Sequence, residues 1–475
     1  MTPETHEEQS HPAWWKPRNW PRAVWVLVIG GILLMVPFCI RTLILSAVPA
    51  MEEPFDVAEF VRWDVPADQD AFTEYRAAAE ICRHIETSLP LEHDLHIVQT
   101  NVVEKGWAEA TEPLKQWLEL YREALAVWRR GTARQFALGV SPTKRPFLAD
   151  HGWLSEIRSV AQMAVLEEIR CLHEGKLQEA WEWVRAIHRS GGHTSHRGEI
   201  LQVLTSCAIH GISMEEAIRW AEHRMVTSDQ LKTSLADVKS DFNLYQSHSN
   251  LLKSIYLEQQ NVLRSREWLA YCSIPYNIDQ HVHGADFVMK MGLWFLGEPE
   301  LSERNARQVL ANQLREIDKP LALRRKRVGT GPAMLFESDP TVPKLPGQLD
   351  AAGIDRGTNL SYVSRQLFMF TVSCDDALLS QAARQAAIEV VLAAQAYQRD
   401  CGEFPEALSL LVPDYLNAVP LDPCDPTGGP LRYRRDDLLN AVVWSVGYDH
   451  ADGGGEIANA NRSAADMGFA LRVVQ

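Results

Sequence analysis

The densest histidine cluster in this chain has residue types that could bind a metal ion. His188, His193 and His196 lie in the segment HRSGGHTSHRGE, and Glu199 follows them closely. Three or four convergent ligands of these types could hold zinc and support metal-dependent hydrolysis. The spacing matches no standard ligand pair such as His-Glu-x-x-His. We therefore expect a solvated loop between helices and keep an envelope metal hydrolase as an alternative.

Other histidine and acidic pairs give weaker signals. His281 and His283 are two residues apart, with Asp279 and Asp286 nearby, and His93 and His96 form a further pair. The adjacent carboxylates Glu215 with Glu216 and Asp375 with Asp376 must point to different faces of a helix, so we expect helix caps or surface charge. The sequence contains no Gly-x-Ser-x-Gly elbow and no phosphate-binding glycine loop. We therefore expect a protein that is not an enzyme.

Helical periodicity dominates residues 51–328 and predicts an all-α domain. Within it, apolar spacing on both sides of Gly175 predicts a helical hairpin, similar to half of a tetratricopeptide unit but without a second copy. Tryptophans at periodic positions should be core anchors; these are Trp117, Trp128, Trp181 and Trp220. Further helices are expected at Phe72–Ser88, Glu112–Arg130, Glu199–His223, Ser228–Asp241 and Leu301–Asp318. Residues 329–374 are rich in Gly, Pro and Asp over their first part, and we expect a linker or long surface loop there.

Residues 375–475 predict a small α+β module. An amphipathic helix runs up to Tyr397, and strands are expected at Leu431–Arg434, Val442–Val446 and Phe469–Val474. A turn at Asp436 and Asp437 should join the first two strands. The expected fold is a long helix packed on a three-stranded antiparallel sheet.

The segment from Tyr397 to Gly455 resembles the globular domain of type II secretion major pseudopilins. The matching positions are Tyr397, Gly402 with Phe404 and Pro405, Leu408 to Val412, Tyr415 and Leu416, Pro420 to Pro423, Leu431 to Arg434, and Ser445 to Asp449. The resemblance implies a calcium-binding loop in which Asp449 is the matching acid and Asp452 lies in the following glycine-rich stretch. Calcium needs six to eight oxygens, so Glu456 or Asp466 would have to contribute, and a plain Gly/Asp turn is the alternative.

An uncharged run from Ala23 to Ile40 is long and apolar enough to cross a membrane. Basic residues at Lys16, Arg18 and Arg22 precede it, which predicts a cytoplasmic N-terminus over residues 1–22 and a signal anchor over residues 23–48. The bulk of the chain would then lie outside the cytoplasmic (inner) membrane of the cell. Cleavage of a signal peptide near Val48-Pro49-Ala50 is the alternative.

Charge and cysteine content restrict the partners. The net charge of −15 lies mostly beyond the apolar run and argues against nucleic acid as a partner. Eight cysteines in 475 residues are too few for a disulfide scaffold. Cys401 and Cys424 could form one bridge in an oxidising compartment, although two free thiols are favoured.

These observations favour a single-span envelope protein with a scaffold or binding role and with protein partners in the envelope. Pseudopilins polymerise through an N-terminal helix preceded by a basic leader, with a Gly processing site and a Glu early in the mature chain. The apolar run here lacks this pattern and lies far from the module, so incorporation into a pilus is not expected. An accessory role in a type II secretion-like system is a further alternative.

Overall fold

The computed structural model describes residues 21–88, 93–145, 152–265, 290–368, 371–457 and 466–473. Most of these residues are helical. The helices of the first half are α1 (Arg22–Ser46), α2 (Val57–Val61), α3 (Phe72–Ser88), α4 (His93–Lys105), α5 (Glu112–Leu120), α6 (Arg122–Thr132), α7 (Gly152–His173), α8 (Leu177–Ser195), α9 (Ile200–Glu222), α10 (Ser228–Phe242) and α11 (His248–Arg264). The helices of the second half are α14 (Glu300–Gln313), α15 (Ala351–Leu360), α16 (Tyr362–Leu367) and α17 (Thr371–Cys401).

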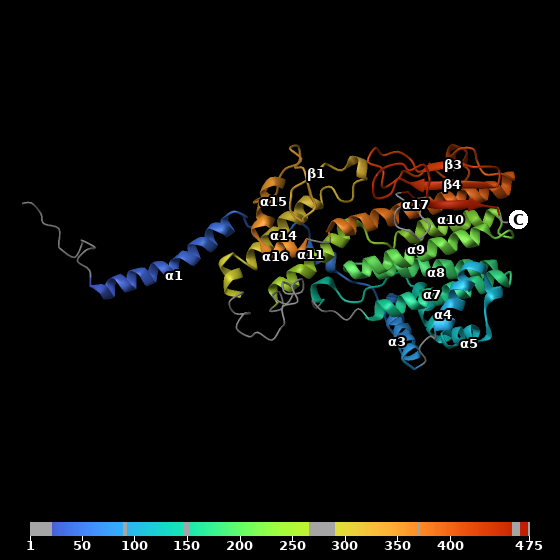
Figure 1. Ribbon diagram of the computed structural model, residues 1–475, viewed down its shortest axis with the longest axis horizontal. Coiled ribbons are helices and arrows are strands. Elements are labelled where there is room, and N and C mark those ends of the chain that lie inside the picture. The colour runs from blue at the N-terminus through green and yellow to red at the C-terminus, as the bar shows by residue number, and fades with distance from the viewer. Residues whose placement is uncertain are drawn as a thin grey trace, which may run out of the picture.

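Helix α1 extends away from the rest of the molecule at one end (Figure 1). It is the one helix, among the described residues, that is long and apolar enough to cross a membrane, over Val24–Ser46 with a mean hydropathy of 2.3. None of that apolar stretch is buried against the rest of the protein. The sequence expectation of an apolar N-terminal helix is therefore confirmed.

The helical hairpin predicted around Gly175 is present as α7 and α8. Gly175 has φ +74°, and the N–H groups of Lys176 and Gly175 donate to the carbonyls of Cys171 and Leu172 at 2.8 and 3.0 Å. This pattern closes the end of a helix with a left-handed residue, a conformation that suits glycine. Trp117, Trp128, Trp181 and Trp220 are buried, as predicted.

The described strands form two small antiparallel sheets. β1 (Arg327–Val328) pairs with β2 (Leu335–Phe336). The larger sheet has the order β3–β4–β5 and contains β3 (Arg432–Arg435), β4 (Asn440–Ser445) and β5 (Met467–Arg472). Helix α17 packs against β4 and β5 on one side and against α9 and α10 on the other (Figure 1). The predicted three-stranded antiparallel sheet and its covering helix are therefore present.

One hydrophobic core crosses the boundary that we predicted before residue 375. It includes Trp128 and Trp220 of the helical layers, Val391 of α17 and Val443 of β4. A second core lies near α1 and joins α11, α14, β2 and α15 through residues such as Tyr256, Leu310 and Phe336. Residues 329–374, where we expected a linker or surface loop, contribute Phe336 and Ile354 of α15 to this second core, while Val363 and Leu367 of α16 are buried in a separate small cluster with Leu263.

Candidate functional site

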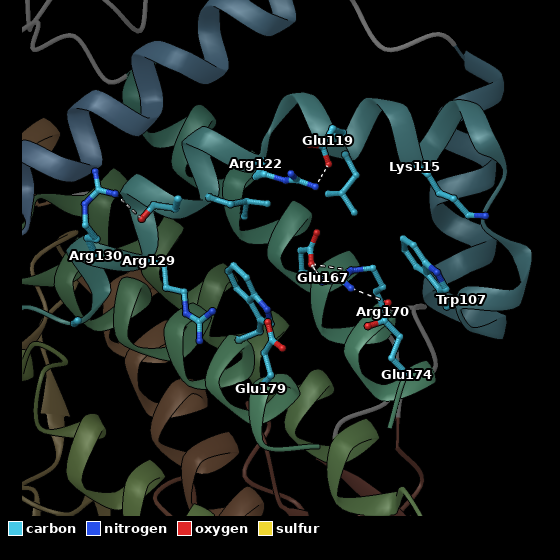
Figure 2. A pocket seen from close by; sticks show the side chains of 15 residues that line it. Trp107, Lys115, Glu119, Arg122, Arg129, Arg130, Glu167, Arg170, Glu174 and Glu179 are labelled. Carbon is cyan, nitrogen blue, oxygen red and sulfur yellow. Dashed lines mark hydrogen bonds and ion pairs between the residues drawn. The ribbon is translucent and has the colours of Figure 1, made fainter. Parts of the chain in front are cut away.

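A charged groove with a volume of about 910 Å³ opens on the side of the helical layers formed by α5 to α8 (Figure 2). This volume is in the upper part of the range for ligand-binding clefts. Its basic side chains are Lys115, Arg122, Arg129, Arg130 and Arg170, and its acidic side chains are Glu119, Glu167, Glu174 and Glu179. Its apolar surface includes Trp107, Leu118, Leu125 and Trp183.

Helical spacing places the basic side chains of α6 in the groove. Arg122, Ala126, Arg129, Arg130 and Ala133 all line it, and positions three, four and seven residues apart share a helix face. Tyr121 separates helices α5 and α6. Its side chain is buried, and its backbone N–H donates to the Leu118 carbonyl at 3.0 Å at the end of α5. The predicted single helix over Glu112–Arg130 is thus two helices.

Ion pairs between residues three or four positions apart lie along the groove surface. The Arg170 guanidinium donates to Glu167 at 2.6 Å and to Glu174 at 2.7 Å. Hydrogen bonds from Lys176 and then from Arg170 lower the pKa of Glu174. Arg122 at the start of α6 pairs with Glu119 in the last turn of α5. The exposed pair of Arg122 with Glu119 contributes little stability, so a ligand can replace one of its partners at small cost.

Two arginines illustrate how the groove could recognise a partner. The Arg129 guanidinium lies 4.5 Å from the ring centroid of Trp183, a cation–π contact that fixes both side chains. Arg130 is exposed and donates to the Ala126 carbonyl at 3.4 Å, a long bond that leaves most of its donors to solvent (Figure 2). A carboxylate from a partner could therefore reach Arg130 without breaking a strong bond.

The titratable groups that line the groove are lysine, arginine and glutamate side chains. Among the described residues, the lining includes no histidine, cysteine or serine, so an acid–base or nucleophilic role there would fall to its glutamates and Lys115.

The predicted solvated loop around His188, His193 and His196 is wrong. Helix α8 runs to Ser195, and His188 and His193 are buried in the core. Within this helix, Gly191 and Gly192 pack closely against the turn that follows α10: a Cβ at Gly191 would lie 2.6 Å from the Tyr245 hydroxyl, and one at Gly192 would lie 2.7 Å from the Leu244 side chain. Sequence spacing alone could have placed His188 on the buried face of α8 with Trp181 and Val184.

The buried histidines are hydrogen-bonded core residues. His193 Nδ1 lies 2.7 Å from the hydroxyl of Tyr75, and His188 Nδ1 lies 3.4 Å from the hydroxyls of Ser213 and Tyr245. Burial, and then the charge of Arg189, lower the pKa of both imidazoles to about 3. In the part of the chain that the structure describes, no group of three His, Cys, Asp or Glu side chains is arranged to hold a metal ion.

The other predicted histidine pairs lie elsewhere in the chain. His93 and His96 lie on α4. His281, His283 and the aspartates beside them lie outside the described residues.

One member of each adjacent acidic pair is buried, so the prediction of caps or surface charge is wrong for these two residues. Glu216 is buried beside Glu168, and burial raises the pKa of both carboxyl groups. Asp375 is buried and accepts hydrogen bonds from Arg324 at 2.9 Å and Arg327 at 2.7 Å. The basic partners of Asp375 lie about 50 positions earlier in the chain, where sequence spacing gives no sign of the contact.

The two candidate calcium ligands lie in the loop after β4, and their carboxylates bind backbone N–H groups of that loop. Asp449 accepts from Ala451 at 3.0 Å, while Asp452 accepts from the Trp444 indole and from Gly454, each at 2.9 Å. Hydrogen bonds from Trp444 and then Gly454 lower the pKa of Asp452. Two carboxylates supply fewer oxygens than calcium requires, so calcium binding stays a prediction.

The backbone of this loop adopts a left-handed conformation at a residue that is not glycine. His450 has φ +57°, in the left-handed region that favours glycine. Its Nδ1 lies 2.8 Å from the Cys424 carbonyl, which ties the loop to the segment before β3. Cys424 itself is buried and Cys401 is exposed, and both are free thiols in this structure.

Sequence reasoning missed the groove. Helical spacing could have shown that Arg122, Arg129 and Arg130 share a helix face, but the opposing Glu167, Arg170 and Trp183 come from a different pair of helices.

Compared with protein-family models, curated proteins and solved structures, the chain matches none.

Proposed function

We propose that this protein is a single-span, membrane-anchored binding protein whose groove holds an extended polypeptide segment of an envelope partner. The observation that carries the proposal is the composition of the groove. It combines basic and acidic side chains with Trp107 and Trp183, and its lining, among the described residues, includes no histidine, cysteine or serine.

The anchor in this proposal is α1. Its uncharged residues 23–40 would cross the inner membrane, the basic residues before them would hold the N-terminus in the cytoplasm, and the groove would face the outer side. The exposed, apolar character of the helix supports this arrangement, because such a surface is costly in water.

An extended polypeptide fits the groove better than a small molecule. The groove is partly open toward solvent, whereas small-molecule sites enclose most of the ligand surface. Carboxylates of the segment would pair with Arg122 and Arg130, and apolar side chains would contact Trp107. Arginine forms paired hydrogen bonds with carboxylates, which would favour an acidic segment.

A photoreactive amino acid at Ala126, which is exposed and lines the groove, tests the proposal in the native membrane. We expect a covalent adduct with one polypeptide, and we expect the double charge reversal Arg122→Glu with Arg130→Glu to abolish it. The control places the same amino acid at Leu438, which is 55% exposed on the turn between β3 and β4. Figure 1 shows these strands on the opposite side of the molecule from α5. An adduct that forms equally from Leu438, or that survives the charge reversal, would refute the groove as the binding site.

The C-terminal resemblance belongs to the same proposal. We propose that residues 375–475 are a pseudopilin-like folding module, and a helix packed on an antiparallel sheet is compatible with that ancestry. An accessory role in a type II secretion-like system is the competing function. The identity of the polypeptide bound at Ala126 separates them, because a secretion component would favour the accessory role.

A further inference from the structure

A short apolar segment lies beside the end of α1 where that helix joins the body of the protein. Residues 290–295 are helical and carry the sequence KMGLWF, followed by Leu296. Met291 and Leu296 are 39% and 45% exposed, while Trp294 and Phe295 are partly buried and meet edge to face with centroids 5.5 Å apart. A water-soluble surface rarely groups such residues without a partner.

Aromatic and backbone contacts fix this segment to α1. The ring of Phe38 meets the ring of Trp294 edge to face at 5.3 Å, and the Arg41 guanidinium lies 4.9 Å from the same tryptophan ring. Arg41 also donates to the Trp294 carbonyl at 2.6 Å and to Glu300 at 3.1 Å. The segment therefore has a defined position along the axis of α1.

A second set of contacts holds the end of α1 to α14. Arg304 donates to the carbonyls of Leu45 and Val48 at 2.8 and 3.0 Å. Leu45 also packs against Gly297, where a Cβ would lie 3.3 Å from the leucine side chain. These bonds satisfy carbonyls that the end of a helix leaves free, and they limit the angle between α1 and the body.

The position of Arg41 defines where the membrane would end. Residues 23–40 are uncharged, whereas Arg41 is a charge whose donors are taken up by protein oxygens. Phe38 precedes Arg41 by three residues, or about 4.5 Å along the helix, which places its ring at the outer edge of the hydrocarbon. Trp294 contacts Phe38 and thus lies at the depth where tryptophan is enriched in membrane proteins.

We propose that residues 290–296, together with Phe38, form a membrane-contact surface that inserts its exposed apolar side chains into the outer interface of the lipid bilayer. The lipid is favoured over a protein partner because the surface is continuous with the exposed face of a helix that the proposed function places in the bilayer. The contact would fix the tilt of the body relative to the membrane and so the direction in which the groove faces. This inference rests on the membrane anchoring in the proposed function.

Lipid crosslinking tests the surface with the full-length protein in phosphatidylcholine vesicles that contain a photoreactive acyl chain. After illumination, mass spectrometry should find lipid adducts on residues 24–40 and on residues 290–296. Adducts on neither segment would refute the anchor itself. Adducts on residues 24–40 without any on residues 290–296 would refute the contact surface and leave the anchor intact.

Two exposed positions provide the matched variants. Met291→Glu with Leu296→Glu should lower the adducts on residues 290–296 several-fold and leave those on residues 24–40 unchanged, because a carboxylate disfavours the hydrocarbon. The control, Leu410→Glu, changes a residue that is 50% exposed in the C-terminal module and should change neither set. Adducts on residues 290–296 that are unchanged in Met291→Glu with Leu296→Glu would refute the insertion of these side chains into the bilayer.

Discussion

Substitution of Asp375 by Asn should destabilise the protein strongly, because this carboxylate balances a buried arginine. Arg324 donates to both carboxylate oxygens of Asp375 at 2.9 Å, and its side chain is 4% exposed. Arg327 adds a bond of 2.7 Å, and His248 lies 3.4 Å away with a pKa lowered by burial. Asparagine would keep the shape but leave the positive charge of Arg324 buried without its counter-ion.

The expected loss is about 3–5 kcal/mol in the free energy of unfolding, the range for removal of one partner from a buried ion pair. Asp376→Asn is the matched control, because burial raises the pKa of the Asp376 carboxyl, so its neutralisation costs little. For that control we expect a change within about 1 kcal/mol. The contrast separates the buried pair from the general effect of changing an aspartate at the start of α17.

A double-mutant cycle identifies the partner. Asp375→Asn combined with Arg324→Met removes both charges, so the double variant should be more stable than Asp375→Asn alone. The measurement is urea unfolding of the full-length protein in detergent micelles, followed by tryptophan fluorescence. A loss of less than about 1 kcal/mol for Asp375→Asn, or strictly additive effects in the cycle, would refute the buried-pair argument.

Three further predictions test other parts of the core. Gly468→Ala should separate β4 from β5 and lower the free energy of unfolding by at least about 1–3 kcal/mol, because the new Cβ would lie 2.0 Å from the Val443 carbonyl oxygen. The control is Gly292→Ala, whose Cβ would have nothing within 4 Å and which should leave stability unchanged. Thermal unfolding of the two variants distinguishes these outcomes. Burial, and then the charge of Glu199, raise the pKa of Glu258 from 4.5 to about 8. Between these two pH values the folded state holds a proton that the unfolded chain releases, so the free energy of unfolding should fall as the pH rises. Glu258→Gln should flatten this pH dependence in urea titrations at several pH values, and an unchanged pH dependence would contradict the prediction. The imidazoles of His188 and His193 should show no titration in NMR spectra between pH 5 and 8, since burial lowers their pKa to about 3; a signal that titrates near 6.5 would contradict their place in the core.

Sequence patterns among neighbouring residues correctly predicted several helices and strands. Phe72–Ser88 was predicted and found as one helix, and the turn at Gly175 followed from glycine and apolar spacing. The three strands of the C-terminal sheet begin within about two residues of the predicted positions. These features depend on side chains that are close in sequence, so periodicity and turn chemistry are sufficient to identify them.

Burial of polar residues could not be predicted in the same way. His193 is a core residue because Tyr75, 118 positions earlier, supplies its hydrogen bond. Residues 329–374 have a loop-like composition, yet Leu335 and Phe336 are buried against α14, and Asp350 caps α15 by accepting from Gly353 at 2.8 Å. The groove likewise needs two helix pairs to come together, which the spacing within either pair does not encode.

The position of α17 between the sheet and helices α9 and α10 has a consequence for how the chain is made. The faces of α9 and α10 that α17 covers are synthesised well before α17 itself, which ends at Cys401. At about 5–20 residues per second, the interval between the end of α10 and the end of α17 is roughly 8 to 30 s. During that time the newly made helices expose an apolar surface, so we expect the emerging chain to need a holding chaperone until its last third has been delivered.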